Sequence, residues 1–260
     1  MVCVLDIAAE PRRLCRMRGS IVPDSLLLPS ESEVHVWSLW IPDVRGQIRD
    51  ISRSLSEEER ARGARFVREE DRERFGLSHG LLRELLGAYL GVDGATLPFQ
   101  ANAWGKPALV PRERWPALRF NMAHSGEAIL YGVGIGREIG VDVEKIKDDF
   151  DFLELARSQF SPEEWLELSG MGGGVAAREA FFRCWTRKEA YLKARGEGLA
   201  EGLGHFSVAL RPGQKPMIFR SAGEEPLDWT MSDLEVFHGY ASALVAAGRD
   251  LQVKHQKLTA

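Results

Sequence analysis

Two stretches decide the fold of this chain: FSPEE at residues 160–164, and LSEEE at residues 55–59, which shows the same pattern. In each stretch a serine stands three residues before a glutamate, which is the capping-box signature of a helix N-terminus. Each serine is followed at the same distance by a basic-acidic pair, Arg83-Glu84 in the first region and Lys188-Glu189 in the second. This recurrence predicts that the chain consists of two related halves.

The recurrence divides the chain into four parts. We expect the related halves at residues 34–133 and 134–248, a loose N-terminal leader at residues 1–33 and a tail at residues 249–260. The leader combines prolines with a cluster of arginines and shows no hydrophobic periodicity, which is typical of chain ends.

Short strands and helices alternate within the halves. Runs of β-forming residues predict strands at residues 34–40, 119–123, 129–135, 139–144, 206–210, 234–237 and 240–246. Apolar residues at helical spacing predict helices at residues 77–90 and 178–195, besides those that the two serines open. The expected class is therefore α+β, with small sheets packed against helices.

The composition is that of an ordinary folded protein. The 260 residues are 44% hydrophobic and 28% charged, and no apolar run is long enough to span a membrane. A net charge of −4 argues against a protein whose main ligand is nucleic acid. The three cysteines are far apart and odd in number, and no signal peptide is recognisable, so we expect a cytoplasmic protein.

Two acidic residues share one face of a predicted strand. In GVDVE, at residues 140–144, Asp142 and Glu144 are two positions apart, so their side chains point the same way while the valines between them point to the core. A hard divalent cation such as Mg²⁺ prefers carboxylate oxygens arranged in this way. The alternative is a solvated pair without a ligand.

The helix predicted at residues 178–195 carries a further carboxylate on its apolar side. Trp185, Glu189 and Lys193 are spaced four apart and therefore lie along one stripe of the helix. Either Glu189 and Lys193 form an exposed ion pair, or Glu189 is a third metal ligand and Lys193 contacts a phosphate.

Other polar motifs precede the acidic strand. His124 follows a predicted strand and is either a structural histidine or an anion contact. Lys106 lies in GKP, at residues 105–107, which is either a plain turn or a turn whose lysine ammonium contacts a ligand. Arginines that alternate with acids between residues 62 and 74 form either a salt-bridged helix surface or a fork for a phosphate.

In their order along the chain, these motifs resemble those of the Sfp-type 4′-phosphopantetheinyl transferases. The resemblance runs from residue 55 to residue 210 and depends on GKP at 105–107, FNMAHS at 120–125, GVDVE at 140–144 and WTRKEA at 185–190. It implies two similar α+β halves related by a pseudo-twofold axis, with the active site between them. It also implies transfer of the 4′-phosphopantetheine arm of coenzyme A to a serine of an apo carrier protein, with release of adenosine 3′,5′-bisphosphate.

The resemblance implies roles for single residues. It gives Asp142, Glu144 and Glu189 as ligands of Mg²⁺, with Glu189 as the general base and Lys193 as the cation that stabilises the leaving phosphate. Glu164 matches an acidic position near the metal, although it is equally the second member of a capping box. The base on the carrier serine is therefore Glu189, Glu164 or a metal-bound water.

Further residues match positions that contact coenzyme A in the family. Arg62, Arg74 and His124 match phosphate contacts, and Lys106 matches a lysine near the adenine and the phosphates. The chain departs from the family pattern at three positions, which weakens individual contacts with the 3′-phosphate: Glu59, Phe75 and Ala123.

The expected partners are coenzyme A and an acyl or peptidyl carrier protein. We expect a monomer, since one chain supplies both halves of the site. Two other functions fit the same carboxylates: Mg²⁺-dependent hydrolysis of a diphosphate, and binding of coenzyme A or of a carrier protein without turnover. The presence of all four motifs in the family order favours transfer.

Overall fold

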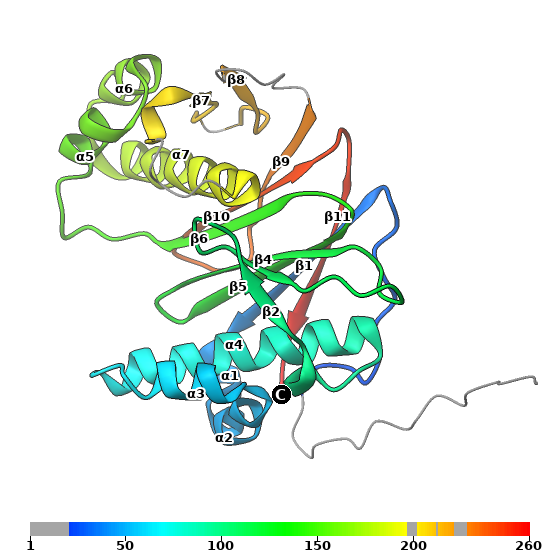
Figure 1. The fold of residues 1–260 in the computed structure, drawn as a ribbon. Helices are drawn as coiled ribbons and strands as arrows, with labels where there is room; N and C mark the ends of the chain where they lie inside the picture. The colour runs from blue at the N-terminus through cyan, green and yellow to red at the C-terminus, as the bar shows by residue number, and fades with distance from the viewer. Residues whose placement is uncertain (1–20, 197–201, 212, 221–227) are drawn as a thin grey trace, which may run out of the picture.

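Helices enclose two stacked β-sheets in the computed structural model of this chain (Figure 1), which describes residues 21–196, 202–211, 213–220 and 228–260. Its strands are β1 (Glu33–Trp40), β2 (Phe99–Ala101), β3 (Pro107–Leu109), β4 (Leu118–Ser125), β5 (Ala128–Ile135), β6 (Ile139–Lys145), β7 (Ser207–Val208), β8 (Ile218–Arg220), β9 (Trp229–Asp233), β10 (Tyr240–Ala247) and β11 (Gln252–Leu258). Its α-helices are α1 (Ile41–Val44), α2 (Ile48–Ile51), α3 (Glu57–Gly63), α4 (Glu69–Leu90), α5 (Phe152–Gln159), α6 (Pro162–Ser169) and α7 (Gly174–Arg195).

The main sheets have the strand orders β11-β1-β5-β4 and β6-β10-β9. In Figure 1, α4 covers the outer side of the first sheet and α7 the outer side of the second. A third core lies between the sheets, so the layers run helix, sheet, sheet, helix. This arrangement confirms the α+β class that the sequence predicts.

Strand β1 shows how the sequence builds these layers. Trp37 and Leu39 are buried in the core beneath α4, whereas Val34 and Val36 are buried in the core between the two sheets. Successive side chains of a strand point to opposite faces, and here both faces are covered. A strand with two buried faces explains the dense run of apolar residues at 34–40.

Both predicted capping boxes are confirmed, and each leads to the same tertiary contact. In α3 and α6 the capping serine accepts a hydrogen bond from the glutamate three residues on, at 3.2 and 3.3 Å. Each glutamate also pairs with a cation 24 residues later, Glu59 with Arg83 at 2.5 Å and Glu164 with Lys188 at 2.7 Å. The halves thus repeat a contact as well as a pattern, while the pseudo-twofold axis stays a prediction.

Several expected elements differ from the structure in extent. Helices α4 and α7 begin earlier than expected, at Glu69 and Gly174, and the strand expected at 206–210 is reduced to β7. The strand expected at 234–237 is wrong, because β9 ends at Asp233 and a loop follows. The apolar residues of this loop, which imitate a strand in the sequence, pack against the core between the sheets.

The C-terminal segment is not a tail. Residues 249–260 contain β11, which pairs in parallel with β1 and buries Leu258 in the core beneath α4. The leader is likewise not loose throughout, because Val22 is buried in the same core and Leu26 N donates to Ala88 O at 3.2 Å. Residues 1–20, which form most of the expected leader, lie outside the described residues.

Candidate functional site

Strand β6 and helix α7 bring the predicted acidic residues together. Asp142 and Glu144 alternate on β6 with valines that are buried between the sheets, so both carboxylates lie on the side that faces α7. Gly140 allows this approach, because a Cβ atom there would lie only 2.0 Å from Ala190 O of α7. A glycine at this position of the motif therefore has a packing reason.

Asp142 and Lys193 form the centre of the site. Lys193 Nζ donates to Asp142 Oδ1 at 2.6 Å, whereas the buried Asp142 Oδ2 accepts no hydrogen bond from any described residue. Burial raises the pKa of Asp142, although the charge of Lys193 opposes this shift. Desolvation of Lys193 is outweighed by the attraction of the neighbouring carboxylates, so the pKa of Lys193 is raised.

Two further carboxylates surround this pair. Glu189 lies one helical turn before Lys193, and burial together with the negative charges of Asp142 and Glu144 raises the pKa of Glu189 to about 7. Burial and the charge of Asp142 also raise the pKa of Glu144. Three carboxylates thus face one ammonium group, which leaves an excess of negative charge in a desolvated place.

We name Asp142, Glu144 and Glu189 the carboxylate cluster. Its donor chemistry fits a divalent cation, because Mg²⁺ prefers carboxylate oxygens and the buried Oδ2 of Asp142 lacks a partner among the described residues. As they stand, no three His, Cys, Asp or Glu side chains in the described ranges already surround a metal-sized position. Lys193 supplies the positive charge beside Asp142 in this structure.

Basic side chains of the first half lie next to the cluster. Partial desolvation and the positive charges of Arg74 and Lys193 lower the pKa of His124, which places these three groups near one another. Arg74 Nε donates to Gly126 O at 3.1 Å, and its guanidinium also contacts Asp71 at 3.1 Å. His124 of β4 thus lies within electrostatic range of Arg74 of α4 and of Lys193 of α7.

Arg62 belongs to the same region through His79. The Arg62 guanidinium lies 5.6 Å from the ring centroid of Phe75, on which His79 stacks. Burial lowers the pKa of His79 to about 4, and the charges of both Arg62 and His124 add to that shift. His79 thus lies within electrostatic range of both residues.

Two predicted site residues have structural contacts instead. Lys106 Nζ donates to Glu138 Oε2, Ile139 O and Ala194 O at 3.0 to 3.2 Å, so it ties β6 to the end of α7 and no longer offers a free ammonium to a phosphate. Glu164 is completely buried, with its carboxylate taken up by Lys188 and by backbone N–H groups. These contacts favour the structural alternative for Glu164, and a role at the metal or as the base stays a prediction.

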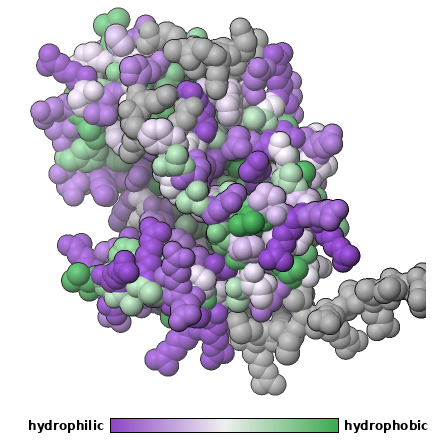
Figure 2. All heavy atoms as spheres, in the orientation of Figure 1, coloured by the Kyte–Doolittle hydropathy of each residue, from purple (hydrophilic) through white to green (hydrophobic). Residues whose placement is uncertain are grey.

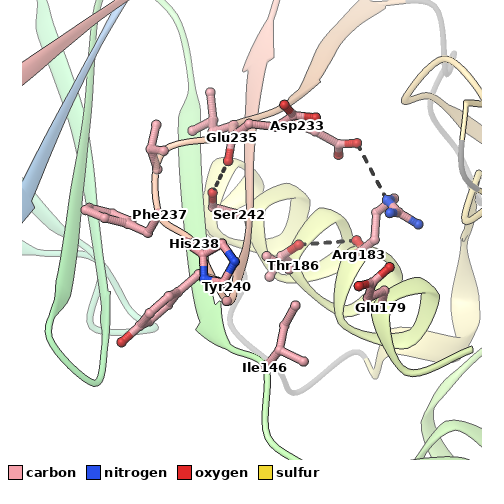
Figure 3. A pocket seen from close by; sticks show the side chains of 14 residues that line it. Ile146, Glu179, Arg183, Thr186, Asp233, Glu235, Phe237, His238, Tyr240 and Ser242 are labelled. Atoms are coloured by element: carbon pink, nitrogen blue, oxygen red, sulfur yellow. Dashed lines mark hydrogen bonds and ion pairs between the residues drawn. The ribbon is translucent and has the colours of Figure 1, made fainter. Parts of the chain in front are cut away.

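Two open clefts lie near the cluster. One, of about 390 Å³, is lined by Glu144, the basic Lys145 and Lys147, and an apolar wall of Phe181, Phe182 and Trp185. The other, of about 630 Å³, lies beyond Ile146 and is shown in Figure 3, where Glu179 and Arg183 of α7 face the loop after β9.

Hydrophilic side chains predominate on the face of the molecule shown in Figure 2.

Sequence reasoning missed two polar residues that contact the acidic strand. Ser125 Oγ donates to Glu144 Oε2 at 2.8 Å, and Asn121 Oδ1 accepts a hydrogen bond from Val141 N at 2.9 Å. Both residues lie in the FNMAHS segment, in which only His124 was assigned a role. Their spacing of four on one strand face was the available signal.

The chain is similar to known proteins over most of its length. A model of the 4′-phosphopantetheinyl transferase superfamily matches residues 138–245, and a model of the N-terminal part of 4′-phosphopantetheinyl transferase matches residues 38–132. The chain is 36% identical over 232 residues to the 4′-phosphopantetheinyl transferase HetI of Nostoc sp., which covers 89% of this chain and 94% of the relative. It is 30% identical over 196 residues to the 4′-phosphopantetheinyl transferase Sfp of Bacillus subtilis, which covers 75% of this chain and 84% of that protein.

Among solved structures, the chain resembles the holo-[acyl-carrier-protein] synthase of Thermotoga maritima at 19% sequence identity and a TM-score of 0.34. That match covers 43% of this chain and 63% of the other.

Proposed function

Because the chain belongs to the 4′-phosphopantetheinyl transferase superfamily and transfers the 4′-phosphopantetheine arm of coenzyme A to carrier proteins, we propose that the carboxylate cluster and Lys193 form the centre of that reaction. The observation that supports this proposal most directly is the convergence of β6 and α7. It places three desolvated carboxylates around one ammonium, beside basic side chains of the other half.

The reaction joins a serine oxygen to phosphorus. The hydroxyl of the carrier serine attacks the β-phosphorus of coenzyme A, the bond from that phosphorus to the α-phosphate oxygen breaks, and adenosine 3′,5′-bisphosphate leaves. Glu189 accepts the serine proton, and Lys193 stabilises the charge that develops on the leaving phosphate. Mg²⁺ held by the carboxylate cluster would neutralise the diphosphate. Such chemistry depends on positioning and charge more than on covalent help from the protein.

Coenzyme A would bind with its phosphates toward the basic side of the site. Arg74 and Lys193 both lie within electrostatic range of His124, and Arg62 lies within electrostatic range of His79, so we assign Arg74, Arg62 and the neutral ring of His124 to the phosphates. Guanidinium groups form strong charge-assisted hydrogen bonds with phosphate oxygens. We assign Lys106 no such contact, since its ammonium already has three acceptors.

The carrier protein would approach the cleft beside Glu144. The cleft has an apolar wall, and its charged lining consists of Lys145 and Lys147 beside Glu144 and Asp149. We propose that the two lysines contact an acidic, helical partner. No helix among the described residues has the length and the apolar character to cross a membrane. We propose a cytoplasmic monomer that acts on carrier proteins and binds neither nucleic acid nor membranes, since both sides of the site come from one chain of net charge −4.

Intact-protein mass spectrometry tests these assignments. One apo acyl carrier and one apo peptidyl carrier are incubated with the enzyme and coenzyme A, in Mg²⁺ or in EDTA. We expect a mass gain of one phosphopantetheine on a carrier, lost in EDTA and absent when the acceptor serine is alanine. Labelling that is undiminished in EDTA would contradict the metal proposal. Cleavage of coenzyme A without carrier labelling would instead point to a hydrolase.

A further inference from the structure

The two main sheets meet where β4 lies against β6, but no backbone strand pairing joins these strands in the described part of the chain. β4 pairs with β5, and β6 pairs with β10, so each of the two is an edge strand of its sheet. The N–H groups on the free edge of β6 therefore need other acceptors, because an unpaired backbone group inside a protein is unfavourable.

Two side chains of β4 supply acceptors for two of these groups, Val141 N and Lys145 N. Asn121 Oδ1 accepts a hydrogen bond from Val141 N at 2.9 Å, and Ser125 Oγ accepts one from Lys145 N at 3.2 Å. In each contact the partners are 20 residues apart in sequence. Both side chains therefore hold β6 in one parallel register against β4, and the contacts enclose the segment that carries Asp142 and Glu144.

We infer that Asn121 and Ser125 are positioning residues, which fix β6 to β4 in place of a backbone ladder and so orient the carboxylate cluster. The inference rests on the proposed function in that it takes this cluster as the metal site. It adds a role to two residues of the FNMAHS segment that do not themselves contact the reacting groups.

Ser125 orients one carboxylate directly. Its hydroxyl has a single hydrogen, which it donates to Glu144 Oε2 at 2.8 Å, and it uses a lone pair for Lys145 N. Because the peptide N–H occupies the oxygen as an acceptor, the hydroxyl hydrogen is directed to Glu144. A hydrogen bond of this kind to a metal-binding carboxylate commonly determines its orientation and the affinity for the metal.

Asn121 acts on the backbone alone. Its side chain is 8% exposed, and Val141, whose N–H it accepts, directly precedes Asp142. His124 lies between Asn121 and Ser125 on β4. The same two contacts therefore set the distance between the proposed phosphate-binding histidine in one half and the proposed metal ligands in the other.

Residue-resolved hydrogen exchange tests the contacts without using activity. In Asn121→Leu we expect the Val141 amide to exchange at least roughly 10-fold faster, and in Ser125→Ala the Lys145 amide. The β5 amides that pair with β1 serve as the internal control for folding. The matched variants Asn121→Asp and Ser125→Thr keep an acceptor and should restore protection. Unchanged exchange at Val141 and Lys145 would overturn the inference.

Binding of Mn²⁺, followed by electron paramagnetic resonance on enzyme saturated with coenzyme A, tests the link to the cluster. We expect Ser125→Ala to bind Mn²⁺ roughly 10-fold more weakly or worse, and Ser125→Thr to recover most of the affinity. The KM for coenzyme A should change far less than kcat. If Ser125→Ala binds Mn²⁺ as tightly as the wild type, the orienting role is overturned. If the wild type binds no Mn²⁺ while the exchange results hold, the proposed metal site fails and the contacts between the strands stand.

Discussion

Glu164 and Lys188 form an ion pair in which neither side chain is exposed, with Lys188 Nζ 2.7 Å from both carboxylate oxygens. Val208 N and Ser161 N donate to the same carboxylate, so both oxygens of Glu164 accept hydrogen bonds from the backbone as well as from Lys188. The pair joins α6 to α7, the helix that carries Glu189. The pair therefore helps to hold the helix of the site in place.

Removing one member of this pair should destabilise the protein strongly. Lys188→Met leaves a buried carboxylate without its counter-charge, and we expect the free energy of unfolding to fall by about 3–5 kcal/mol. The double variant Glu164→Leu/Lys188→Met removes both charges and should recover most of that loss. Urea denaturation followed by circular dichroism measures all three proteins. A single variant as stable as the wild type would contradict the structural role.

The same capping-box pattern shows what local sequence can and cannot predict. A serine followed by a glutamate three residues on predicted the start of α3 and of α6, because both partners lie within one turn. Whether Glu164 also served a metal was undecidable at that level. Its partner Lys188 is 24 residues away, and only tertiary packing makes the pair completely buried.

Elements defined by distant pairing were missed for a related reason. β11 pairs with β1 from the other end of the chain, and most of its side chains are exposed, so it lacks the apolar alternation that marks a half-buried strand. The loop at 234–237 gave the opposite error, since its apolar residues pack on the core between the sheets although β9 has already ended at Asp233. Periodicity reports which residues are buried, and it does not report what they pair with.

Glu189→Gln should abolish most of the transfer and leave the fold intact. The amide keeps the size of the side chain but cannot accept the serine proton or supply a charged ligand, so we expect kcat to fall by at least roughly 100-fold. Glu179→Gln, an exposed position of the same helix outside the cluster, is the matched control. Asp142→Ala should behave like Glu189→Gln. Rates near that of the wild type in either variant would disprove the assignment of the cluster, as measured by carrier labelling.

Arg74→Ala should act on the binding of coenzyme A. Arg74 lies within electrostatic range of His124, with which we propose that it binds the phosphates. Losing one charge-assisted contact should raise the KM for coenzyme A by roughly 10-fold, with a smaller effect on kcat. Arg72→Ala is the control, since Arg72 lies two residues away on the same helix and donates to Phe66 O. Equal KM values in the two variants would remove Arg74 from the proposed phosphate contacts.

The stability of the protein should fall in mild acid because of His79. The ring stacks on Phe75 with centroids 3.9 Å apart, and burial lowers the pKa of His79 from 6.5 to about 4. The folded state therefore binds a proton at His79 less readily than the unfolded state does. The contribution of neutral His79 to the free energy of unfolding is complete above pH 6.5 and is lost as the pH falls from 6.5 toward 4. The loss amounts to at most about 3 kcal/mol.

His79→Gln removes the titrating group and should flatten this part of the profile. Urea unfolding at about pH 7.5 and about pH 5 gives the difference for each protein, and the wild type should lose more stability between the two values than the variant does. The other carboxylates and histidines titrate in both proteins, so the comparison isolates His79. Identical losses would mean that His79 is as easily protonated in the folded protein as in the unfolded chain, contrary to its packing against Phe75.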